Sequence, residues 1–580
     1  MTDIIAKLRD ADLSDYAANE RLKVESDYLR GQLEADMADI ATGAVSDADL
    51  QLTKFHGFYL QDDRDLRSER RQQKLEPLYA FMVRCRIPGG RLSAEQWRTI
   101  DDVATHYANN TLRITTRQTL QYHGIYKRNL RAHLKEINNV MVDTIAACGD
   151  VNRNVTSTAN PSRSKLHYRL YELGAQISDH LLPHTRAYHE IFLGEERVFG
   201  GPDEVVEPLY TQYYLPRKFK IGLALPPDNE IDIHTNDLGF IAIVENGEIV
   251  GANIAVGGGM GSTHGEPETY PRISTLIGYA PYDKLIDVAE KVMLVQRDNG
   301  DRKNRKHARL KYTVDTMGVE GFKSELQKYL GYDLEPAREY HFETTGDILG
   351  WYQGEDGLWH HGLFIENGRI KDYPTDAPIH AGMLLKSGLR AIAESFDGDI
   401  VMSCNQNIII SNVPETHKTV IDDLLNQYHM LKSATPLRQH SIACVALPTC
   451  GLAMAESERY LPTLLDKLDN IMRDAGLAND PIVIRMTGCP NGCGRPFMAE
   501  IGLVGKAIGR YNLYLGGNFI GTRLNKMYRE NIDEAEILKE LTPLLYRYAQ
   551  ERHDGECFGD FVIRAGVIKA TENGLDFHDQ

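Results

Sequence analysis

The sequence predicts an α+β protein made of two related halves, each with a small α+β module followed by a larger α/β module. Two internal matches support this prediction. Residues 112–120 (LRITTRQTL) match 400–408 (IVMSCNQNI), and 251–259 (GANIAVGGG) match 510–518 (RYNLYLGGN). A repeat spaced by about 260–290 residues is too long for a solenoid and indicates a duplication. A pseudo-twofold axis would then relate the halves, with room for a large ligand between them.

The modules are expected to follow one another along the chain. We place an acidic N-terminal extension at residues 1–75. The first half follows, with its small module at 76–145 and its large module at 146–345. The second half has its small module at 346–430 and its large module at 431–580. The first 50 residues carry 12 acidic and 5 basic side chains, which is −7 of the net −17. This segment is either a solvated tail or a docking segment for a partner. If it only docks, a chain beginning near Gln51 should keep its own chemistry.

Composition excludes several classes of protein. Hydrophobic residues make up 42% of the chain and charged residues 25%, which are ordinary globular values. A net charge of −17 argues against nucleic acid as the main partner. The N-terminus lacks the apolar core of a signal peptide, and the longest apolar run, 442–455, is too short to cross a membrane. We therefore expect a cytoplasmic protein.

Four cysteines form two close pairs near the C-terminal end. Cys444 and Cys450 are separated by five residues, Cys489 and Cys493 by three, and 38 residues lie between the pairs. Four thiolates are what a 4Fe–4S cluster needs. Structural zinc is the next option, although it favours tighter spacing, and a disulfide would need an oxidising compartment. The remaining cysteines are expected to be buried small hydrophobic residues: Cys85, Cys148, Cys404 and Cys557.

Cations occur at strand-like spacing in the first half. Lys218 and Lys220 share a face because side chains alternate along a strand, with Phe219 pointing away. Residues 112–123 are expected to form a single strand-like run, with one polar face made of Arg113, Thr115, Arg117, Thr119, Gln121 and His123. From the residues alone, this polar face is also what a half-buried antiparallel strand shows to solvent.

The cysteine motifs TGCPNGCGR and CVALPTC resemble those of the sirohaem and 4Fe–4S sulfite and nitrite reductases. The glycines of the first motif would let the backbone approach a flat macrocycle closely. The resemblance continues, in the family's order, at FMVRCRIPGG (81–90), TTRQTLQYHG (115–124), GDVNRNV (149–155), LPRKFK (215–220) and GGNFIGTR (516–523). It implies ferredoxin-like small modules and larger modules that hold a sirohaem and a 4Fe–4S cluster between the halves.

The resemblance also implies roles for individual residues. The cluster ligands would be the four paired cysteines, with Cys493 bridging the cluster to the sirohaem iron. The substrate cations would be Arg84, Arg153, Lys218 and Lys220. Sirohaem bears eight carboxylates, so basic and polar side chains would surround it. The expected residues of that shell are Arg113, Arg117, His123, Asn491, Arg163, Lys306, Arg309 and Lys311, with Arg117 the first choice.

The implied reaction is the six-electron reduction of sulfite to sulfide, a step of cysteine biosynthesis. No G-x-G-x-x-G opens a helix and no G-x-x-x-x-G-K-[ST] occurs, so no nicotinamide or flavin site is expected on this chain. Electrons would come from a flavoprotein (alpha) subunit that carries FAD and FMN and draws on NADPH. A sirohaem nitrite reductase and a ferredoxin-dependent sulfite reductase share these motifs. Outside the family, an iron–sulfur electron carrier or a zinc-stabilised scaffold would also fit the cysteines.

Overall fold

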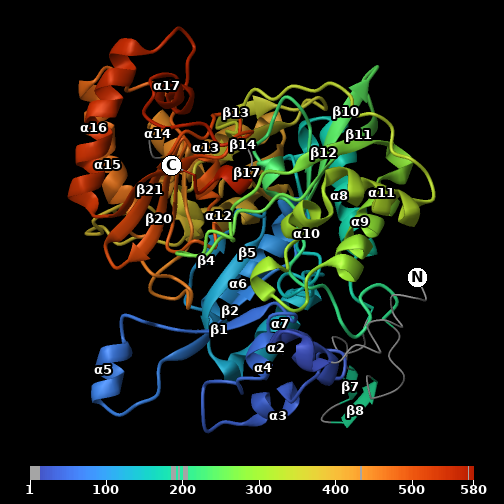
Figure 1. Cartoon of the computed structure of the whole chain (residues 1–580). Helices are drawn as coiled ribbons and strands as arrows, with labels where there is room; N and C mark the ends of the chain where they lie inside the picture. Colours follow the sequence, from blue (N-terminus) through green and yellow to red (C-terminus); the bar gives the residue numbers. More distant parts are fainter. Residues whose placement is uncertain are drawn as a thin grey trace.

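The computed structural model describes residues 13–184, 191–193, 196–199, 207–431, 434–572 and 574–579. Within these ranges the strands form four five-stranded sheets and a two-stranded sheet of β7 (Ile191–Leu193) and β8 (Glu196–Phe199). The five-stranded sheets fall into two small and two large ones. Figure 1 shows the large modules side by side, the first-half module with β10, β11 and β12 and the second-half module with β20 and β21.

The two small sheets have the same topology and exchange one strand. Their strand orders are β1-β2-β5-β4-β15 and β13-β14-β17-β16-β3. The first contains β1 (Phe58–Asp62), β2 (Tyr79–Arg84), β5 (Leu120–Ile125), β4 (Leu112–Ile114) and β15 (Arg369–Ile370). The second contains β13 (Gly350–Gln353), β14 (Trp359–Leu363), β17 (Ile408–Val413), β16 (Asp399–Met402) and β3 (Arg91–Ser93). Each half thus supplies the last strand of the other half's sheet.

The two large sheets repeat a second topology. Their orders are β6-β9-β10-β11-β12 and β18-β19-β20-β21-β22, and in both the first two pairings are parallel and the last two antiparallel. The first contains β6 (Thr156–Ser157), β9 (Ile221–Ala224), β10 (Leu238–Glu245), β11 (Glu248–Val256) and β12 (Thr275–Pro281). The second contains β18 (Ser441–Ala443), β19 (Ile484–Thr487), β20 (Ile501–Ala507), β21 (Arg510–Leu515) and β22 (Lys526–Ile532). The internal sequence matches correspond to β4 and β16 and to β11 and β21, which are the fourth strands of their sheets. The duplicated α+β fold is therefore confirmed.

The helices of the small modules repeat in the same way, and those of the large modules repeat in part. In the small modules they are α6 (Ala94–Tyr107) and α7 (Leu130–Asn139), then α12 (Leu385–Ser395) and α13 (Lys418–Gln427). In the large modules they are α8 (Lys165–His180), α9 (Leu285–Asn299), α10 (Leu310–Met317) and α11 (Val319–Leu330), then α14 (Pro436–Gln439), α15 (Leu461–Asp474), α16 (Glu534–Glu551) and α17 (Phe558–Arg564). Local sequence sets their starts. Ser93 and Gln96 form a capping box at α6, and Asp533 and Glu536 form one at α16.

The small modules share one hydrophobic core. Val83 and Ile114 of the first half pack in the same cluster as Ile400 and Ile410 of the second, whereas each large module has a separate core. The strand exchange explains this, because β3 and β15 carry each half into the other. The predicted domain limits stay predictions, but β1 precedes the limit at residue 75 and is already part of the first small sheet.

The prediction of one strand over residues 112–123 is wrong. β4 and β5 form a hairpin, and Thr115 N donates to Thr119 O at 2.8 Å across its turn. Gln118 has φ +51° in that turn, a left-handed conformation that interrupts strand alternation. Part of the predicted polar face is present, because Arg113 and Gln121 are direct partners across the hairpin.

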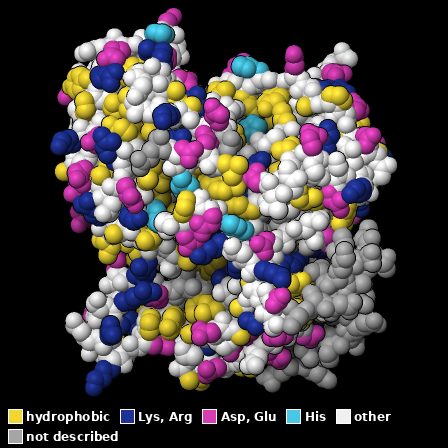
Figure 2. Space-filling view, viewed as in Figure 1, with side chains coloured by type: hydrophobic (Ala, Val, Ile, Leu, Met, Phe, Trp, Pro, Cys, Tyr) yellow, Lys and Arg dark blue, Asp and Glu magenta, His cyan; other side chains and the backbone are white. Residues whose placement is uncertain are grey.

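The N-terminal region packs against the body of the protein within its described part. It contains the helices α2 (Ala18–Glu25), α3 (Leu33–Ala38) and α4 (Asp49–Leu52), and α5 (Arg67–Gln72) follows β1. Leu29, Leu52 and Lys23 are all buried, so this segment is not a solvated tail. Residues 1–12 lie outside the described residues. α5 stands on an arm away from the body, over which Lys and Arg side chains gather in Figure 2.

None of the helices in the described ranges is long and apolar enough to cross a membrane. Of the four isolated cysteines, Cys85, Cys148 and Cys404 are buried, as predicted, and Cys557 is partly exposed.

Candidate functional site

The second large sheet brings both cysteine motifs to one edge. β18 and β19 are adjacent and parallel, with Ala443 opposite Met486. Cys444 follows β18 directly, and Cys489 follows β19 after one glycine. Because the carboxyl ends of parallel strands meet at the same edge, two motifs 38 residues apart converge there.

The four thiols interact with one another. Burial, and then Cys493 and Cys489, raise the pKa of Cys444. Burial followed by Cys493 raises the pKa of Cys489 to about 11. The raised pKa values favour the protonated forms of Cys444 and Cys489, and a positive centre such as a metal cluster would compensate the charge of their thiolates.

The spacing of these thiols bears on the choice of metal. Zinc would draw its sulfur ligands to about 3.8 Å from one another, given Zn–S bonds of about 2.3 Å. Across the described ranges, no three His, Cys, Asp or Glu side chains gather as they would around one metal ion. Four cysteine thiolates are the ligand set of a 4Fe–4S cluster.

The thiols also have polar neighbours. Gly488 N donates to Cys444 Sγ at 3.3 Å, and Asn491 Nδ2 donates to Cys489 Sγ at 3.4 Å. Asn491 was expected in the sirohaem shell, and here it contacts a predicted cluster ligand. Thr116 Oγ1 in the first-half hairpin turn donates to Cys493 O at 2.9 Å. Cys493 is the exposed member of the four and lies where the two halves meet.

The glycines of the TGCPNGCGR motif approach protein and not open space. Gly492 has φ +66°, and a Cβ there would lie 2.7 Å from Met260 O of the first half. A Cβ on Gly494 would lie 3.0 Å from Met486 O. The expectation that these glycines make room for a flat ligand is therefore not supported. They allow the Cys493 loop to pack tightly against β19 and the first half.

Arg153, Lys218 and Lys220 lie on neighbouring extended segments of the first large sheet. Asn152 and Phe219 form a parallel bridge that continues the pairing of β6 with β9, and Arg153 N donates to Phe219 O at 2.9 Å. Phe219 is fully buried, whereas the lysines on either side keep some accessible surface. This is the alternation expected of a strand, with both lysines on the face opposite Phe219.

The electrostatics of the two lysines suit an anion. Burial, then Arg217 and Arg309, lower the pKa of Lys218 to about 7. Burial and then Lys218 lower the pKa of Lys220 well below its usual value. Cys493 acts in the opposite direction on both, which places all three groups together. In the described part of the chain neither ammonium group has a hydrogen-bond or ion-pair partner. A bound anion would supply one and restore both charges.

A row of side chains crosses the first small sheet. Arg84 is opposite Gln121, Gln121 is opposite Arg113, and Arg113 is opposite Arg369 of the exchanged strand β15. Arg113 pairs with Glu458 at 2.8 Å, and Arg369 binds both oxygens of Glu458 at 2.6 and 3.0 Å. Cys493 interacts electrostatically with Arg84 and Arg113. The row thus ends beside the cysteine motifs of the second half.

Several predicted sirohaem ligands are bound to protein acceptors. Arg117 donates to Asn154 O at 2.5 Å, Ile221 O at 2.9 Å and Asn236 Oδ1 at 2.8 Å. To bind a sirohaem carboxylate, Arg117 would have to give up some of these hydrogen bonds. That role of Arg117 stays a prediction. Arg309 is held by both oxygens of the fully buried Asp237, at 3.0 and 2.8 Å.

The other members of that shell divide into buried and peripheral residues. Lys311 Nζ donates to backbone carbonyls, including Gly261 O at 2.6 Å. Burial, with Arg369, Arg113 and Arg84 nearby, lowers the pKa of His123, so this ring is neutral. Lys306 is exposed and pairs with Glu266 at 2.5 Å, and Arg163 pairs with Asp228 at 2.7 Å.

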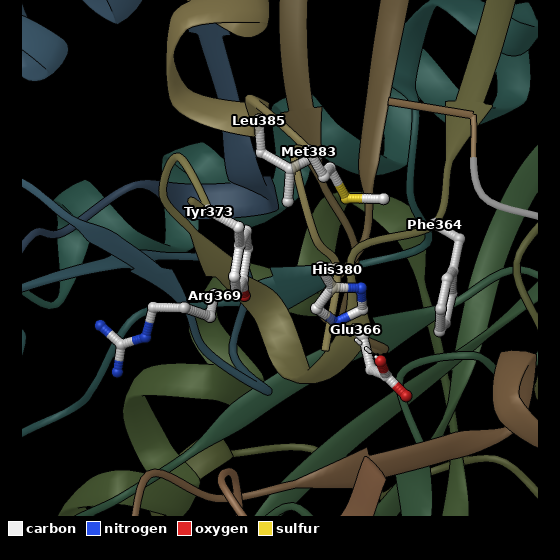
Figure 3. A pocket seen from close by; sticks show the side chains of 7 residues that line it. All are labelled: Phe364, Glu366, Arg369, Tyr373, His380, Met383 and Leu385. Carbon is white, nitrogen blue, oxygen red and sulfur yellow. Dashed lines mark ion pairs between the residues drawn. The ribbon is translucent and has the colours of Figure 1, made fainter. Parts of the chain in front are cut away.

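Two small pockets lie outside this cluster. Figure 3 shows one, lined by Phe364, Glu366, Arg369, Tyr373, His380, Met383 and Leu385. In it His380 pairs with Glu366 at 2.8 Å. The other is lined by Thr345, Gly346, Asn405, Gln439, His440, Ile442, Val483 and Arg485. The first borders the arginine row through Arg369, and neither contains a predicted site residue.

Sequence reasoning missed residues that come from other parts of the chain. Arg369 and Glu458 lie in no recognised motif. The strand exchange brings Arg369 to Arg113, and the second large module supplies Glu458. Tyr59 and Cys148 lie beside Arg84. Cys148 directly precedes the GDVNRNV motif, which was the one available signal.

Two family models match the chain. The nitrite/sulfite reductase ferredoxin-like half domain matches residues 73–140 and 352–428, which are the two small modules. The nitrite and sulphite reductase 4Fe-4S domain matches residues 172–334, in the first large module. The cysteines lie in the second large module, whose sheet has the same topology.

Relatives match over the whole chain. The sulfite reductase [NADPH] hemoprotein beta-component of Chromohalobacter salexigens is 64% identical over 99% of this chain and 100% of its own length. The protein of the same name in Bacillus subtilis is 54% identical over 100% of both chains. The solved structure of the Mycobacterium tuberculosis NirA protein shares the fold, with a TM-score of 0.73 at 23% identity over 95% of this chain and 96% of that one. The chain therefore belongs to the nitrite and sulphite reductase family, among the proteins named sulfite reductase [NADPH] hemoprotein beta-component.

Proposed function

We propose that this protein reduces sulfite to sulfide in a six-electron reaction, as the hemoprotein component of an NADPH-dependent sulfite reductase. Its cofactors are a sirohaem and a 4Fe–4S cluster. The observation that carries the proposal is that basic residues of the first half lie beside the cysteine motif of the second half. Two lysines without partners, Lys218 and Lys220 of the first half, lie close enough to Cys493 of the second half for its charge to shift their pKa values.

In this proposal Cys444, Cys450, Cys489 and Cys493 would hold the cluster, and Cys493 would hold the sirohaem as well. When bound, these centres supply electrons to the substrate sulfur one at a time. The protein binds and orients the substrate oxygens through Arg84, Arg153, Lys218 and Lys220. Each converging cation contributes roughly 1.5–3 kcal/mol through a charge-assisted hydrogen bond.

The same cations are proposed to supply protons to the substrate. Three oxygens leave as water, and each needs protons at the leaving oxygen atom. Lys218, with a pKa of about 7, can give up a proton near neutral pH. The sirohaem carboxylates would be held by Arg113, Arg117, His123, Lys306, Arg309 and Lys311, with Asn491 beside the cluster.

The partner in this proposal is a flavoprotein alpha subunit carrying FAD and FMN, which passes electrons from NADPH. Support comes from the relatives' name, which makes them one component of a larger enzyme. A cytoplasmic location is also proposed, because thiolate cluster ligands need a reducing compartment.

The test is a visible spectrum followed by a steady-state assay of the purified protein with reduced methyl viologen. Sirohaem absorption in the red and faster turnover of sulfite than of nitrite are expected. A colourless protein, or a brown one without red bands, would overturn the cofactor assignment. A clear preference for nitrite would reassign the reaction within the family.

A further inference from the structure

The segment ahead of the first family motif brings a tyrosine to the side of Arg84. β1 pairs with β2, and Tyr59 is opposite Met82. Arg84 N donates to Gly57 O at 2.9 Å, which fixes the end of β2 against β1. The Arg84 guanidinium lies over the Tyr59 ring, 5.8 Å from its centre. Tyr59 therefore covers one side of a predicted substrate cation.

A buried thiol lies between these two residues. Arg84 Nη1 donates to Cys148 Sγ at 3.0 Å. Burial and then the neighbouring Cys148 raise the pKa of Tyr59, so the thiol lies next to the tyrosine as well. Cys148 has no exposed surface. Close packing holds its loop in place, since Gly149 has φ +92° and a Cβ there would lie 2.7 Å from the Phe55 ring. The thiol thus has a fixed position.

The remaining contacts of Arg84 define its free edge. With the Gln121 amide turned so that its oxygen faces Arg84, that oxygen accepts from Nη2 at 2.5 Å and Nε at 3.2 Å. A guanidinium has five N–H groups in a rigid plane. Gln121 and Cys148 take three of them, so two remain without an acceptor among the described residues. Both belong to the terminal nitrogens, where guanidinium groups bind anions in pairs.

We propose that Cys148 and Tyr59 are positioning residues for substrate binding, which hold the Arg84 guanidinium so that its two free N–H groups face the substrate oxygens. The proposal rests on the proposed function. Cys148 sets the rotation of the guanidinium plane, because it binds the nitrogen that Gln121 leaves alone. Tyr59 lies beside the thiol and covers one face of the guanidinium, so the plane cannot turn over.

Substitutions at Cys148 separate hydrogen bonding from packing. Cys148→Ala removes the acceptor, and we expect the KM for sulfite with reduced methyl viologen to rise roughly tenfold, with a smaller change in kcat. The dissociation constant of sulfite, from a spectroscopic titration of the oxidised protein, should rise by a similar factor. Cys148→Ser keeps an acceptor and should stay within about threefold of the wild type. Tyr59→Phe should raise KM less than Cys148→Ala does. Cys557→Ala, at a distant thiol, is the matched control and should change nothing.

A double-mutant cycle then tests whether Cys148 acts through Arg84. In an Arg84→Lys background, Cys148→Ala should have almost no further effect, since the group it positions is gone. The proposal would be overturned if the effects of Arg84→Lys and Cys148→Ala on KM were additive. It would also be overturned if Cys148→Ala and Cys148→Ser raised KM equally. Wild-type KM in Cys148→Ala would also refute it, while sulfite reduction by the wild type would leave the proposed function intact. A wild type that reduces no sulfite would instead refute the proposed function.

Discussion

Asp232 and Arg495 occupy equivalent positions in the two halves and form an ion pair with each other. Each has a left-handed backbone, with φ +47° and +57°, and each precedes a single 3-10 turn that leads into β10 or β20. Arg495 Nε lies 3.0 Å from Asp232 Oδ2, and Arg485 binds the same oxygen at 2.5 Å. All three side chains are buried. The duplication has thus produced opposite charges at one repeated position, and they join the halves two residues from Cys493.

Asp232→Asn should destabilise the protein strongly. It leaves Arg485 and Arg495 buried without a counter-charge, a change that typically costs about 3–5 kcal/mol. Urea denaturation followed by circular dichroism measures this loss. Asp554→Asn, the same change at an exposed position, should stay within about 0.5 kcal/mol of the wild type. Equal stability of the two variants would show that the pair does not hold the halves together.

Cys493→Ser should disturb both cofactors together, because this thiol is proposed to join them. We expect reduced iron content and altered absorption of both the cluster and the sirohaem, measured on the purified protein. Cys557→Ser should disturb neither. An intact, magnetically coupled spectrum in Cys493→Ser would contradict the bridging assignment.

Replacing Lys218 or Lys220 by Met keeps the bulk and removes the charge and its donors. If a lysine only binds sulfite, KM rises and kcat stays constant. We expect kcat to fall as well, by roughly a hundredfold for the loss of about 3 kcal/mol of transition-state stabilisation. Sirohaem content should stay near the wild-type level. Wild-type kinetics in the double variant would exclude both residues from the site.

The pKa of Lys218 predicts how sulfite binding depends on pH. Burial and neighbouring cations lower this pKa from its usual value to about 7, so the ammonium group loses its proton as pH rises through 7. KM for sulfite should therefore increase above pH 7. Sulfite also titrates near this range, so the wild type is compared with Lys218→Met in the same buffers. The part of the pH dependence due to Lys218 should vanish in the variant, and parallel profiles would contradict the prediction.

Lys23 should support the substrate segment from the N-terminal region. Its buried Nζ pairs with Glu20 at 2.6 Å and donates to Leu215 O at 2.7 Å, three residues before Lys218. Lys23→Met should lower the melting temperature and raise KM for sulfite with an artificial donor. Arg21→Met, on the exposed side of the same helix, should do neither.

The same contacts change the expectation for a chain beginning at Gln51. It would lose Lys23 and Glu20, and Arg302 would lose its partner Glu20. We therefore expect such a chain to be unstable, whereas the sequence suggested that it would keep its chemistry. Full activity of the shortened chain with methyl viologen would show that the N-terminal contacts are dispensable.

The sequence by itself determined the duplicated α+β fold, the family and the two cysteine motifs. These features are local or repeated. Cys489 and Cys493 are close in the chain, and the match of 112–120 to 400–408 reflects equivalent strands β4 and β16. The alternation of Lys218, Phe219 and Lys220 is also local, and Phe219 is buried as it predicts.

Only the tertiary structure decided which partners these residues have. The hairpin turn at 115–119 interrupts the predicted strand, and it gives Arg117 backbone acceptors that no pattern foretells. The exchange of β3 and β15 brings Arg369 to Arg113 across more than 250 residues of sequence. Hydrogen bonds and ion pairs form by proximity in space, and proximity between distant segments depends on how whole sheets pack. Local sequence therefore fixes which groups are present, and the packing of the halves fixes what each group binds.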